Sequence, residues 1–290
     1  MPSPFIRRRR LADTMRALRE RQGLTTDELA ERIYRSRSCV SKLENARGRS
    51  DVGDVMKIMD VLGITGDQWD ELVTLAREAA ERGWWDKYGN SMGYRQRMYA
   101  DLEYNAATIR GYYQYAFPGV LQTPEFTEAL IDLDKAAGPL IYKPDRMVKA
   151  RQHRQAMALR PDGPSCDFIL DEFVIRRLAV PTQIMVGQLR HLASTVSSAP
   201  RLSVQVLPVN ARTEGDPPRS TFTIYTFQER SDPPVAVADT FSTDVVNTAP
   251  SEVRRYEEMF ERLREVAISS VKSLTFLEDA ADELADLAGS

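Results

Sequence analysis

Apolar residues in the first eighty or so positions recur at the spacing of α-helices. The first stripe, at positions i, i+4 and i+7, consists of Leu11, Met15 and Leu18. Gly23 ends this helix, and Thr25, three residues before Glu28, gives the capping-box pattern that opens a second short helix. Three more helices are predicted from the apolar positions Val40 and Leu43, then Val52, Val55, Met59 and Leu62, then Trp69, Leu72, Val73 and Ala76. We therefore expect a compact domain of five short helices.

Farther along the chain, helical and strand periods alternate. Helices are predicted from Met98 to about Gly111, from a Thr123 cap with Pro124 as first residue, over 143–160, around 184–196, and over 252–265 and 270–287. Strands are predicted for the apolar runs CDFIL, RLSVQVLP, TFTIYTF and VAVAD, each bounded by turn residues. The expected fold is mainly α with an α+β second domain, a helical domain carrying a small β-sheet.

A change of composition after Arg82 marks the expected domain boundary. Gly83, two adjacent tryptophans and the sequence GNSMGY interrupt the apolar stripes. We therefore assign a first domain to residues 1–82, a linker to 83–94, and the α+β domain to 95–287.

Charge divides the chain in the same way. Residues 1–50 hold 13 Arg and Lys against 6 acids, although the whole chain has a net charge of −3. Only a locally dense positive field binds phosphates at physiological salt, so we expect residues 1–50 to bind a polyanion. The alternative is a basic face that is merely solvated.

Two groups of basic and polar residues are candidates for that contact. On the third predicted helix, the face opposite Val40 and Leu43 presents Arg37, Ser38, Ser41, Lys42 and Asn45. Before the first predicted helix, Arg7, Arg8, Arg9 and Arg10 are interpreted as an arm that lies along phosphates or in a minor groove. A disordered, solubilising tail is the alternative for this arm.

The segment LRERQGLTTDELAERIYRSRSCVSKLENAR resembles the helix-turn-helix of the xenobiotic-response-element family of bacterial regulators. The resemblance implies that the helix from Ser36 to Asn45 enters the major groove of double-stranded DNA and that the helix from Thr26 to Tyr34 braces it on the backbone. Arg37, Ser38, Ser41 and Lys42 would then face base edges, and Thr26 a phosphate. Arginine and lysine pair with guanine, so a guanine-containing half-site is expected.

The same resemblance implies a structural pair between Arg19 of the first helix and Glu44. Tyr34 and Ala46 stand where the family usually has glycine. Tyr34 can adopt the turn at a strain cost of about 1 kcal/mol, and Gly48 is expected to reverse the chain after Ala46. Cys39, beside Val40, is interpreted as a packing residue, with a redox switch as the alternative.

The segments WWDKYG, DLEYNAATIRGYYQYAFPGVLQT, KARQ, ILDE, QLRHL and VQVLP together resemble the actinobacterial family of WhiJ-like regulators. That resemblance implies a transcriptional regulator, expected to repress, that is antitoxin-like and has a small acidic BldB-like protein as its partner. Phe117, Val120 and residues 209–218 depart from the family pattern, which leaves the role of 209–218 open.

The second domain has three candidate roles. Arg146, Lys149 and Arg154, on the basic helix over 143–160, offer a docking strip for the acidic partner, although Met147 and Ala150 can pack inward while these charges merely face water. Alternatively, a group of tyrosines lines a pocket for a small apolar effector: Tyr99, Tyr104, Tyr112, Tyr113 and Tyr115. In the third role, the second domain only brings two copies of the first domain together as a dimer.

Catalysis is not expected. The chain has no phosphate-loop, nucleophile-elbow, zinc-protease or dinucleotide motif. Asp171, Glu172 and Glu103 are conceivable catalytic acids, but surface or capping roles are favoured for them. Cys39, Cys166, His153 and His191 are too few and too scattered for a disulfide framework or a metal site, so no cofactor is expected.

Two further expectations concern assembly and location. One recognition helix reads only a few base pairs, so a homodimer on a pseudo-palindromic site is expected. No apolar run approaches the ~18 residues that span a bilayer, so we expect a cytoplasmic protein.

Overall fold

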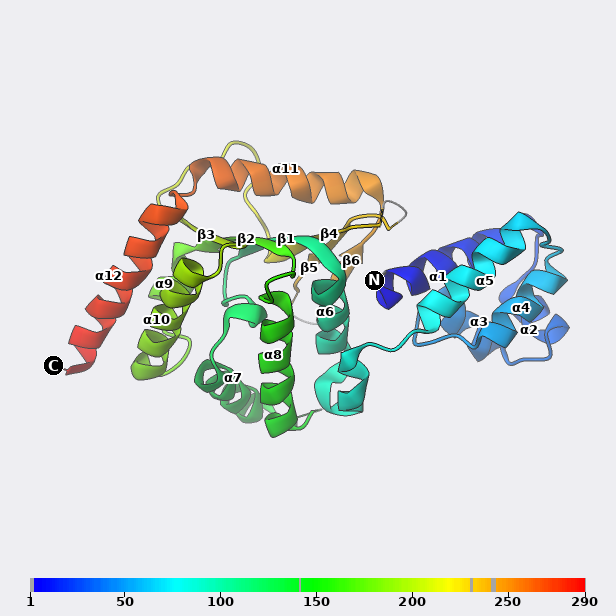
Figure 1. Ribbon diagram of the computed structural model, residues 1–290, viewed down its shortest axis with the longest axis horizontal. Coiled ribbons are helices and arrows are strands. Elements are labelled where there is room, and N and C mark those ends of the chain that lie inside the picture. The colour runs from blue at the N-terminus through cyan, green and yellow to red at the C-terminus, as the bar shows by residue number, and fades with distance from the viewer. Residues whose placement is uncertain (1–2, 141, 230–231, 241–243, 290) are drawn as a thin grey trace. The chain divides into compact units, whose positions relative to one another are not determined.

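A computed structural model describes residues 3–140, 142–229, 232–240 and 244–289 of the chain (Figure 1). By its internal contacts the chain divides into two units, Met1–Asp86 and Lys87–Ser290. Each unit encloses a hydrophobic cluster of its own. The described chain is mainly helical, and a mixed β-sheet lies in the second unit.

The described part of the first unit contains five α-helices: α1 (Pro4–Arg21), α2 (Thr26–Arg32), α3 (Arg37–Glu44), α4 (Val52–Val61) and α5 (Asp67–Ala80). The predicted capping box is present, since Thr25 Oγ1 accepts from the Glu28 amide at 3.2 Å and the Thr25 amide donates to Glu28 Oε2 at 2.8 Å. Gly23 and Gly63 take positive φ values just after α1 and α4 and let the chain turn away. The helices bury a common core that includes Met15, Leu29, Val55, Ile58 and Met59.

Most of the expected linker, residues 83–94, is helical. A 3₁₀ segment, η1 (Trp84–Met92), changes direction at Gly89, whose φ is 52°. Helix α6 (Gly93–Asn105) begins directly after it. No loop therefore separates η1 from α6, the first α-helix of the second unit.

The second unit is organised around a six-stranded sheet in the order β3-β2-β1-β4-β5-β6. Its strands are β1 (Ala106–Tyr113), β2 (Ser165–Asp171), β3 (Leu202–Leu207), β4 (Phe222–Phe227), β5 (Val235–Ala238) and β6 (Val245–Asn247). Strands β1, β2 and β3 are mutually parallel, whereas β4 runs antiparallel to β1, and β5 and β6 continue that pattern.

The parallel strands require crossover connections, and helices supply them. Between β1 and β2 lie η2 (Gly119–Leu121), α7 (Pro124–Ala137) and α8 (Pro144–Ala158). Between β2 and β3 lie α9 (Glu172–Arg176) and α10 (Thr182–Ser198), and the chain closes with α11 (Pro250–Val266) and α12 (Ser270–Gly289). Thr123 caps α7 as predicted, because its Oγ1 accepts from the Phe126 amide at 3.1 Å.

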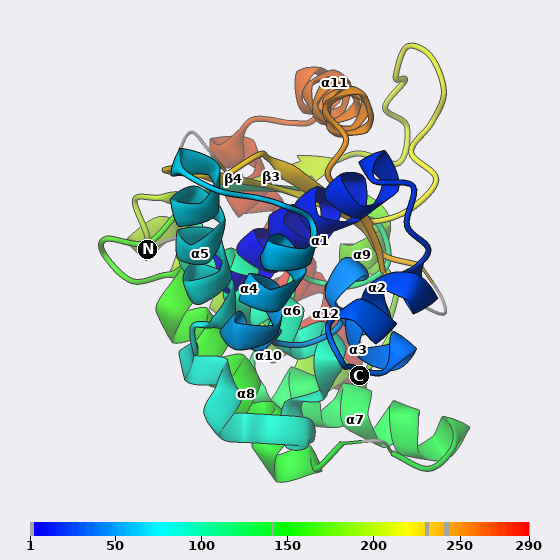
Figure 2. The same cartoon turned by 90° about the vertical axis from the view of Figure 1, so that its right-hand side faces the viewer.

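The two faces of the sheet are covered differently. Helix α11 lies across one face, where Phe260 packs with Tyr112 and Ile224, and α6 and α8 lie on the other side of the sheet (Figures 1 and 2). Side chains alternate along a strand, so Tyr113 and Tyr225 point away from α11. Helices α10 and α12 pack together against β3.

The predicted helix from Met98 to Gly111 is wrong beyond Asn105, because strand β1 follows there. Helix α6 ends at Asn105, and the next eight residues form the central strand of the sheet. The run TIRGYY is rich in β-branched and aromatic residues, which favour strands. Helix α9 and strand β6 were not predicted, because each is five residues or shorter.

Candidate nucleic-acid interface and an interior cavity

Helix α3 presents the polar face that the sequence predicts. Val40 and Leu43 are buried in the core of the first unit, whereas Arg37, Ser38 and Lys42 are exposed. Ser41, on the same helix, is half-buried. The nearest acid found for Arg37 is Asp27, with Nη1 and Oδ2 3.6 Å apart and both side chains largely exposed, so this pair holds the guanidinium only weakly. The face is therefore accessible and rich in hydrogen-bond donors.

Two polar residues lie at helix N-termini beside this face. Ser36 is the N-cap residue of α3, is exposed, and makes no side-chain capping hydrogen bond. Thr26 is the first residue of α2, just after the capping box, and is half-buried. Helix N-termini attract phosphates, so both hydroxyls are suitably placed to donate to a nucleic-acid backbone.

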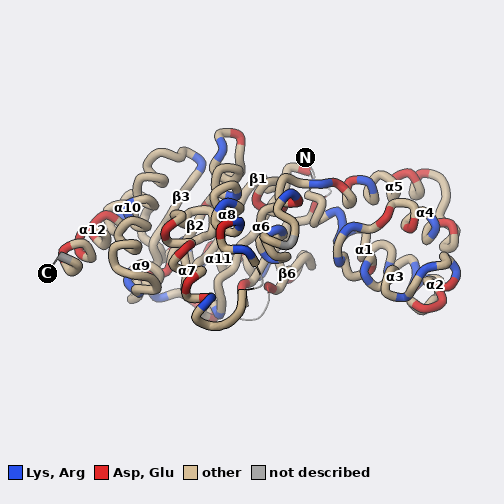
Figure 3. Tube along the Cα trace, turned by 90° about the horizontal axis from the view of Figure 1, so that it is seen from below, with Lys and Arg blue, Asp and Glu red and all other residues tan. Residues whose placement is uncertain are grey.

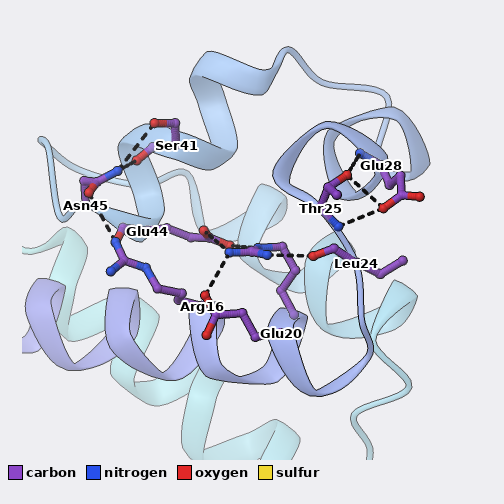
Figure 4. A network of polar contacts seen from close by, with 9 residues as sticks. Arg16, Glu20, Leu24, Thr25, Glu28, Ser41, Glu44 and Asn45 are labelled. Carbon is purple, nitrogen blue, oxygen red and sulfur yellow. Dashed lines mark hydrogen bonds and ion pairs between the residues drawn. The ribbon is translucent and has the colours of Figure 1, made fainter.

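The pair implied by the resemblance is present in the structure. Arg19 on α1 donates from Nε to Glu44 Oε1 at 2.6 Å and from Nη2 to Glu44 Oε2 at 3.0 Å, and both side chains are buried. Arg19 Nη1 also donates to the Leu24 carbonyl at 2.6 Å, which ties the end of α3 to the turn before α2 (Figure 4). These bonds raise the pKa of Arg19, so the guanidinium stays charged.

Asn45, predicted as a DNA contact, is engaged within the first unit. Its amide donates to the Ser41 carbonyl at 2.7 Å, and its Oδ1 accepts from Arg16 Nη2 at 3.2 Å (Figure 4). Arg16 also donates to the Glu44 carbonyl at 2.5 Å. Because Arg16 bonds the last carbonyl of α3, its positive charge offsets the negative end of that helix. Sequence reasoning did not assign this role to Arg16.

The structure contradicts the arm expected at Arg7, Arg8, Arg9 and Arg10. These residues belong to α1, whose N-cap Ser3 accepts a hydrogen bond from the Ile6 amide. Arg7 forms an ion pair with Glu78 of α5 at 2.9 Å, and Arg8 donates to the Ala79 carbonyl at 3.3 Å. The acid that pairs with Arg7 is thus on α5, about seventy residues later, where a local reading of the sequence does not find it. Figure 3 shows the basic positions of α1 and the acidic ones of α5.

The predicted docking strip on α8 is also wrong in part. Arg146 and Lys149 are exposed, but Arg154 is only 4% exposed. Its guanidinium donates to both carboxylate oxygens of Glu103 on α6, at 2.5 and 2.8 Å, and to Gln96. Arg154 lies at helical spacing from the buried residues Met147, Ala150 and Ala158, so it belongs to the inner face of α8.

Arg154 contributes to the wall of a cavity of about 700 Å³ in the second unit. The sheet supplies one side of this cavity, from β1, β4 and β5, and α6, α8 and the η2 region supply another. Aromatic residues at its wall are Tyr99, Tyr113, Tyr115, Phe117 and Tyr225. Three of the five tyrosines predicted to line a pocket are among them.

Tyr104 and Tyr112 lie elsewhere. The Tyr104 ring is stacked against the Arg160 guanidinium, and Tyr112 faces α11 and donates to Asp171 Oδ2 at 2.9 Å. Charged groups also line the cavity, beside its apolar surface. Four arginines and two carboxylates line it: Arg95, Arg151, Arg154, Arg219, Glu103 and Asp239.

The matches to protein families fall on either side of the boundary between the two units. Residues 10–72 match a family described as a helix-turn-helix domain. Residues 96–279 match a domain of unknown function, DUF5753, over more than half of the chain. The chain belongs to the DUF5753 family. No match was found among curated proteins or among solved structures.

The helix-turn-helix match supports a DNA-binding regulator, because it spans α2 and α3, the helices that carry the exposed polar face. All cavity residues except Arg95 lie within the matched DUF5753 segment. This DUF5753 protein thus carries a candidate DNA interface in its first unit and a charged cavity in its second.

The three carboxylates considered for catalysis have structural partners in this DUF5753 protein. Glu103 is held by Arg154, Asp171 caps α9 by accepting from the Phe173 amide at 3.0 Å, and Glu172 accepts from the Val209 amide at 2.9 Å. Within the described residues, no cluster of three metal-binding side chains is found. None of the described helices combines the length and apolarity needed to cross a membrane.

Cys39 is half-buried beside Asp54, with its thiol donating to Oδ2 at 3.6 Å. Burial raises the pKa of this thiol, and the negative charge of Asp54 raises it further. Thiolates are the reactive form of cysteine, so the structure favours the packing role over a redox switch.

Proposed function

We infer that the protein is a sequence-specific DNA-binding transcriptional regulator, a cytoplasmic repressor, and that its own helix α3 reads the major groove. The observation that carries this proposal is the exposed face of Arg37, Ser38 and Lys42 on a helix whose other face is buried. That face is held in place by the bidentate bond between Arg19 and Glu44. A rigid helix with exposed donors is what base recognition requires.

Arg37 and Lys42 are proposed to contact guanine edges, each pairing with O6 and N7. Ser38 and Ser41 add shorter donors on the same face, and Ser36 and Thr26 donate to phosphates at the two helix N-termini. Asn45 contributes to DNA binding indirectly, because its side-chain amide already donates to Ser41 and its Oδ1 accepts from Arg16. Arg8, Arg9 and Arg10 add positive potential from α1 rather than from a flexible arm.

A homodimer on a pseudo-palindromic operator is part of the proposal. Helix α3 has eight residues, so one copy reads only a few base pairs. Specific affinity then needs two half-sites about one helical turn apart. Analytical ultracentrifugation of the protein on a half-site and on the full operator tests this part by its stoichiometry.

The test of the interface uses the operator selected from random duplexes by the full-length chain. In a mobility-shift titration, Arg37→Ala and Lys42→Ala are each expected to weaken binding by about 1 to 3 kcal/mol and to relax preference at one base position. Lys57→Ala is the matched control, since Lys57 is an exposed cation on α4. If a variant that carries both Arg37→Ala and Lys42→Ala binds the operator as tightly as the Lys57→Ala control does, α3 is not the reading helix.

For the second unit, a small acidic BldB-like partner remains a proposal, as does the antitoxin-like character that accompanies it. Its docking surface on α8 is reduced to Arg146 and Lys149, because Arg154 is buried. Replacing both exposed residues by Glu and measuring capture of the purified partner by calorimetry tests this surface. Retained capture would remove α8 from the interface.

The cavity favours a second candidate role, sensing of a small molecule. Its volume of about 700 Å³ lies within the range of ligand pockets, and its wall combines aromatic rings with a few charged groups. The first helix of the unit, α6, lines it through Tyr99 and Glu103 and follows directly after η1. A ligand in the cavity would therefore contact α6, the first α-helix of the second unit.

A further inference from the structure

The arginines of the cavity differ in how their charge is balanced. Arg95 pairs with Asp239 at 2.5 Å and with Asp244 at 2.9 Å. Arg154 has the bidentate bond to Glu103. In both cases the guanidinium charge is matched by carboxylates of the protein itself, and such an arginine serves to hold the wall together.

Arg151, one turn before Arg154 on α8, has no such partner. In the described part of the chain its guanidinium donates through Nη1 to the neutral Gln122 Oε1, and its buried Nε finds no acceptor. Asp134 acts on it only from a distance and is itself engaged, since its Oδ2 accepts from the Tyr142 hydroxyl at 2.6 Å. Among the described residues, Arg151 is therefore a cation at the cavity wall with no carboxylate in direct contact.

This arrangement is costly unless something else supplies the negative charge. Burial and the nearby Arg154 charge lower the pKa of Arg151 to about 10, which measures how poorly the site accommodates the cation. Arg151 is half-buried, and a charge withdrawn from water without a paired carboxylate is costly, so such groups cluster at functional sites. The guanidinium of arginine matches the geometry of carboxylates and phosphates, which accept two parallel hydrogen bonds from it.

The rest of the wall indicates what accompanies the anionic group. Tyr99, Tyr113 and Phe117 contribute aromatic rings to the wall, and Thr221 and Ser220 contribute hydroxyls. Tyr113 is fixed by a hydrogen bond between its hydroxyl and Thr223 Oγ1, at 3.1 Å. A planar ring fits such a wall better than an aliphatic chain, because aromatic pairs gain from stacked and edge-to-face contacts.

We propose that the cavity binds a small aromatic oxyanion, a carboxylate or phosphate, whose charged group pairs with the guanidinium of Arg151. This assigns a ligand class to the second unit that differs from the apolar effector expected from the sequence. Binding itself stands apart from the DNA-reading role; only the effect of the ligand on operator affinity rests on the proposed function.

The test measures binding to the full-length chain without DNA. Probes are phenyl phosphate and benzoate, with neutral benzamide as the isosteric comparison and inorganic phosphate as the anion without a ring, each followed by calorimetry up to about 10 mM. Phenyl phosphate or benzoate is expected to bind at least about tenfold more tightly than benzamide, as a charge-assisted pair requires. The stronger of these two acids identifies the oxyanion.

Three variants locate the site. Arg151→Met is expected to reduce acid binding about tenfold or more, and Arg151→Lys to retain part of it. Lys272→Met, which removes an exposed cation on α12, should leave acid binding unchanged. Equal binding of acid and amide, unchanged binding in Arg151→Met, or no binding of either aromatic acid would overturn the proposal. Operator titration with and without the bound acid is measured separately, so failure there leaves the binding result intact.

Discussion

Tyr34 and Ala46 share a left-handed backbone conformation, with φ values of 55° and 52°, one just before α3 and one just after it. Among the described residues they are the non-glycine positions with positive φ. Both stand where related helix-turn-helix sequences have glycine, and Gly48, with φ of 87°, continues the reversal after Ala46. The turns around α3 thus keep their geometry and carry the strain of two side chains.

Glycine at either position is expected to stabilise the protein. Ala46→Gly and Tyr34→Gly each remove a strain of about 1 kcal/mol, less the extra entropy that glycine gains in the unfolded chain. Thermal unfolding by calorimetry should show an upward shift of the midpoint for both variants.

Ala17→Gly is the control for this experiment. Ala17 is exposed in the middle of α1 with ordinary helical geometry, so glycine there should lower stability by about 0.5 to 1 kcal/mol. A fall in stability for Ala46→Gly comparable to that of Ala17→Gly would show that the left-handed conformation carries no strain.

Truncation of Glu44 is expected to be severe. Glu44→Ala leaves the buried Arg19 guanidinium without its carboxylate, a loss of about 3 to 5 kcal/mol for a buried pair. Glu20→Ala removes the other acid near Arg19, which is exposed and 3.4 Å away, and should cost less than about 1 kcal/mol. Urea unfolding of both variants gives the comparison, and similar midpoints would contradict the structural role of the pair.

Arg151 and Arg154 should respond in opposite ways to the same substitution. Arg154→Met leaves the buried carboxylate of Glu103 without its cation and should lower the free energy of unfolding by about 3 to 5 kcal/mol. Arg151→Met removes a cation that has no carboxylate in direct contact among the described residues, so the free energy of unfolding should stay level or rise. Denaturant titration distinguishes them. A large loss for Arg151→Met would point to a protein carboxylate that balances it in solution.

Removal of residues 1–10 should destabilise the first unit as well as change its salt dependence. The deletion takes away the first turns of α1, including the ion pair of Arg7 with Glu78. Arg9→Gln with Arg10→Gln keeps that pair and so isolates the electrostatic contribution. The salt slope of operator binding should flatten by up to ~0.9 per lost phosphate contact in the double variant. An unchanged slope would place these residues away from the backbone of the DNA.

Cys39 is expected to alkylate slowly near neutral pH. Burial and the Asp54 carboxylate raise its thiol pKa, so at any pH below that value it holds less thiolate than a free cysteine does. The rate with iodoacetamide should rise only at more alkaline pH, and Asp54→Asn should bring that rise to lower pH. The measurement uses a Cys166→Ser background, although burial raises the pKa of Cys166 to about 12 and already protects it. A rate at pH 7 equal to that of free cysteine would restore the redox interpretation.

Local patterns predicted those parts of the fold that depend on near neighbours. The capping box at Thr25, the cap of α7 at Thr123 and the polar face of α3 each involve residues within one or two helical turns. The helix stripe that ran into β1 failed because Ala106 and Ile109 continue the spacing of Met98 and Leu102 by coincidence. What makes that segment a strand is its pairing with β2 and β4, far along the chain.

The candidate sites divide in the same way. Arg154 was read as a surface charge because its partner, Glu103, lies 51 residues earlier, and the arm was misread because Glu78 lies on α5. A signal for Arg154 was nevertheless present. It follows Met147 and Ala150 at i+7 and i+4, which places it on the inner face of α8. Because Arg154 is charged, it was nevertheless assigned to the surface.

The place of β1 in the sheet also sets an order of assembly on the ribosome. The core of the first unit is complete once its own helices have emerged, since it draws only on residues before Asp86. Strand β1 then waits for β4, because Tyr113 meets Thr223, 110 residues later. At about 5 to 20 residues per second this interval lasts on the order of ten seconds. Long-range pairing of this kind is also slow to form after synthesis. Newly made chains therefore pass through a stage in which the helical unit is folded and the cavity has not yet been built.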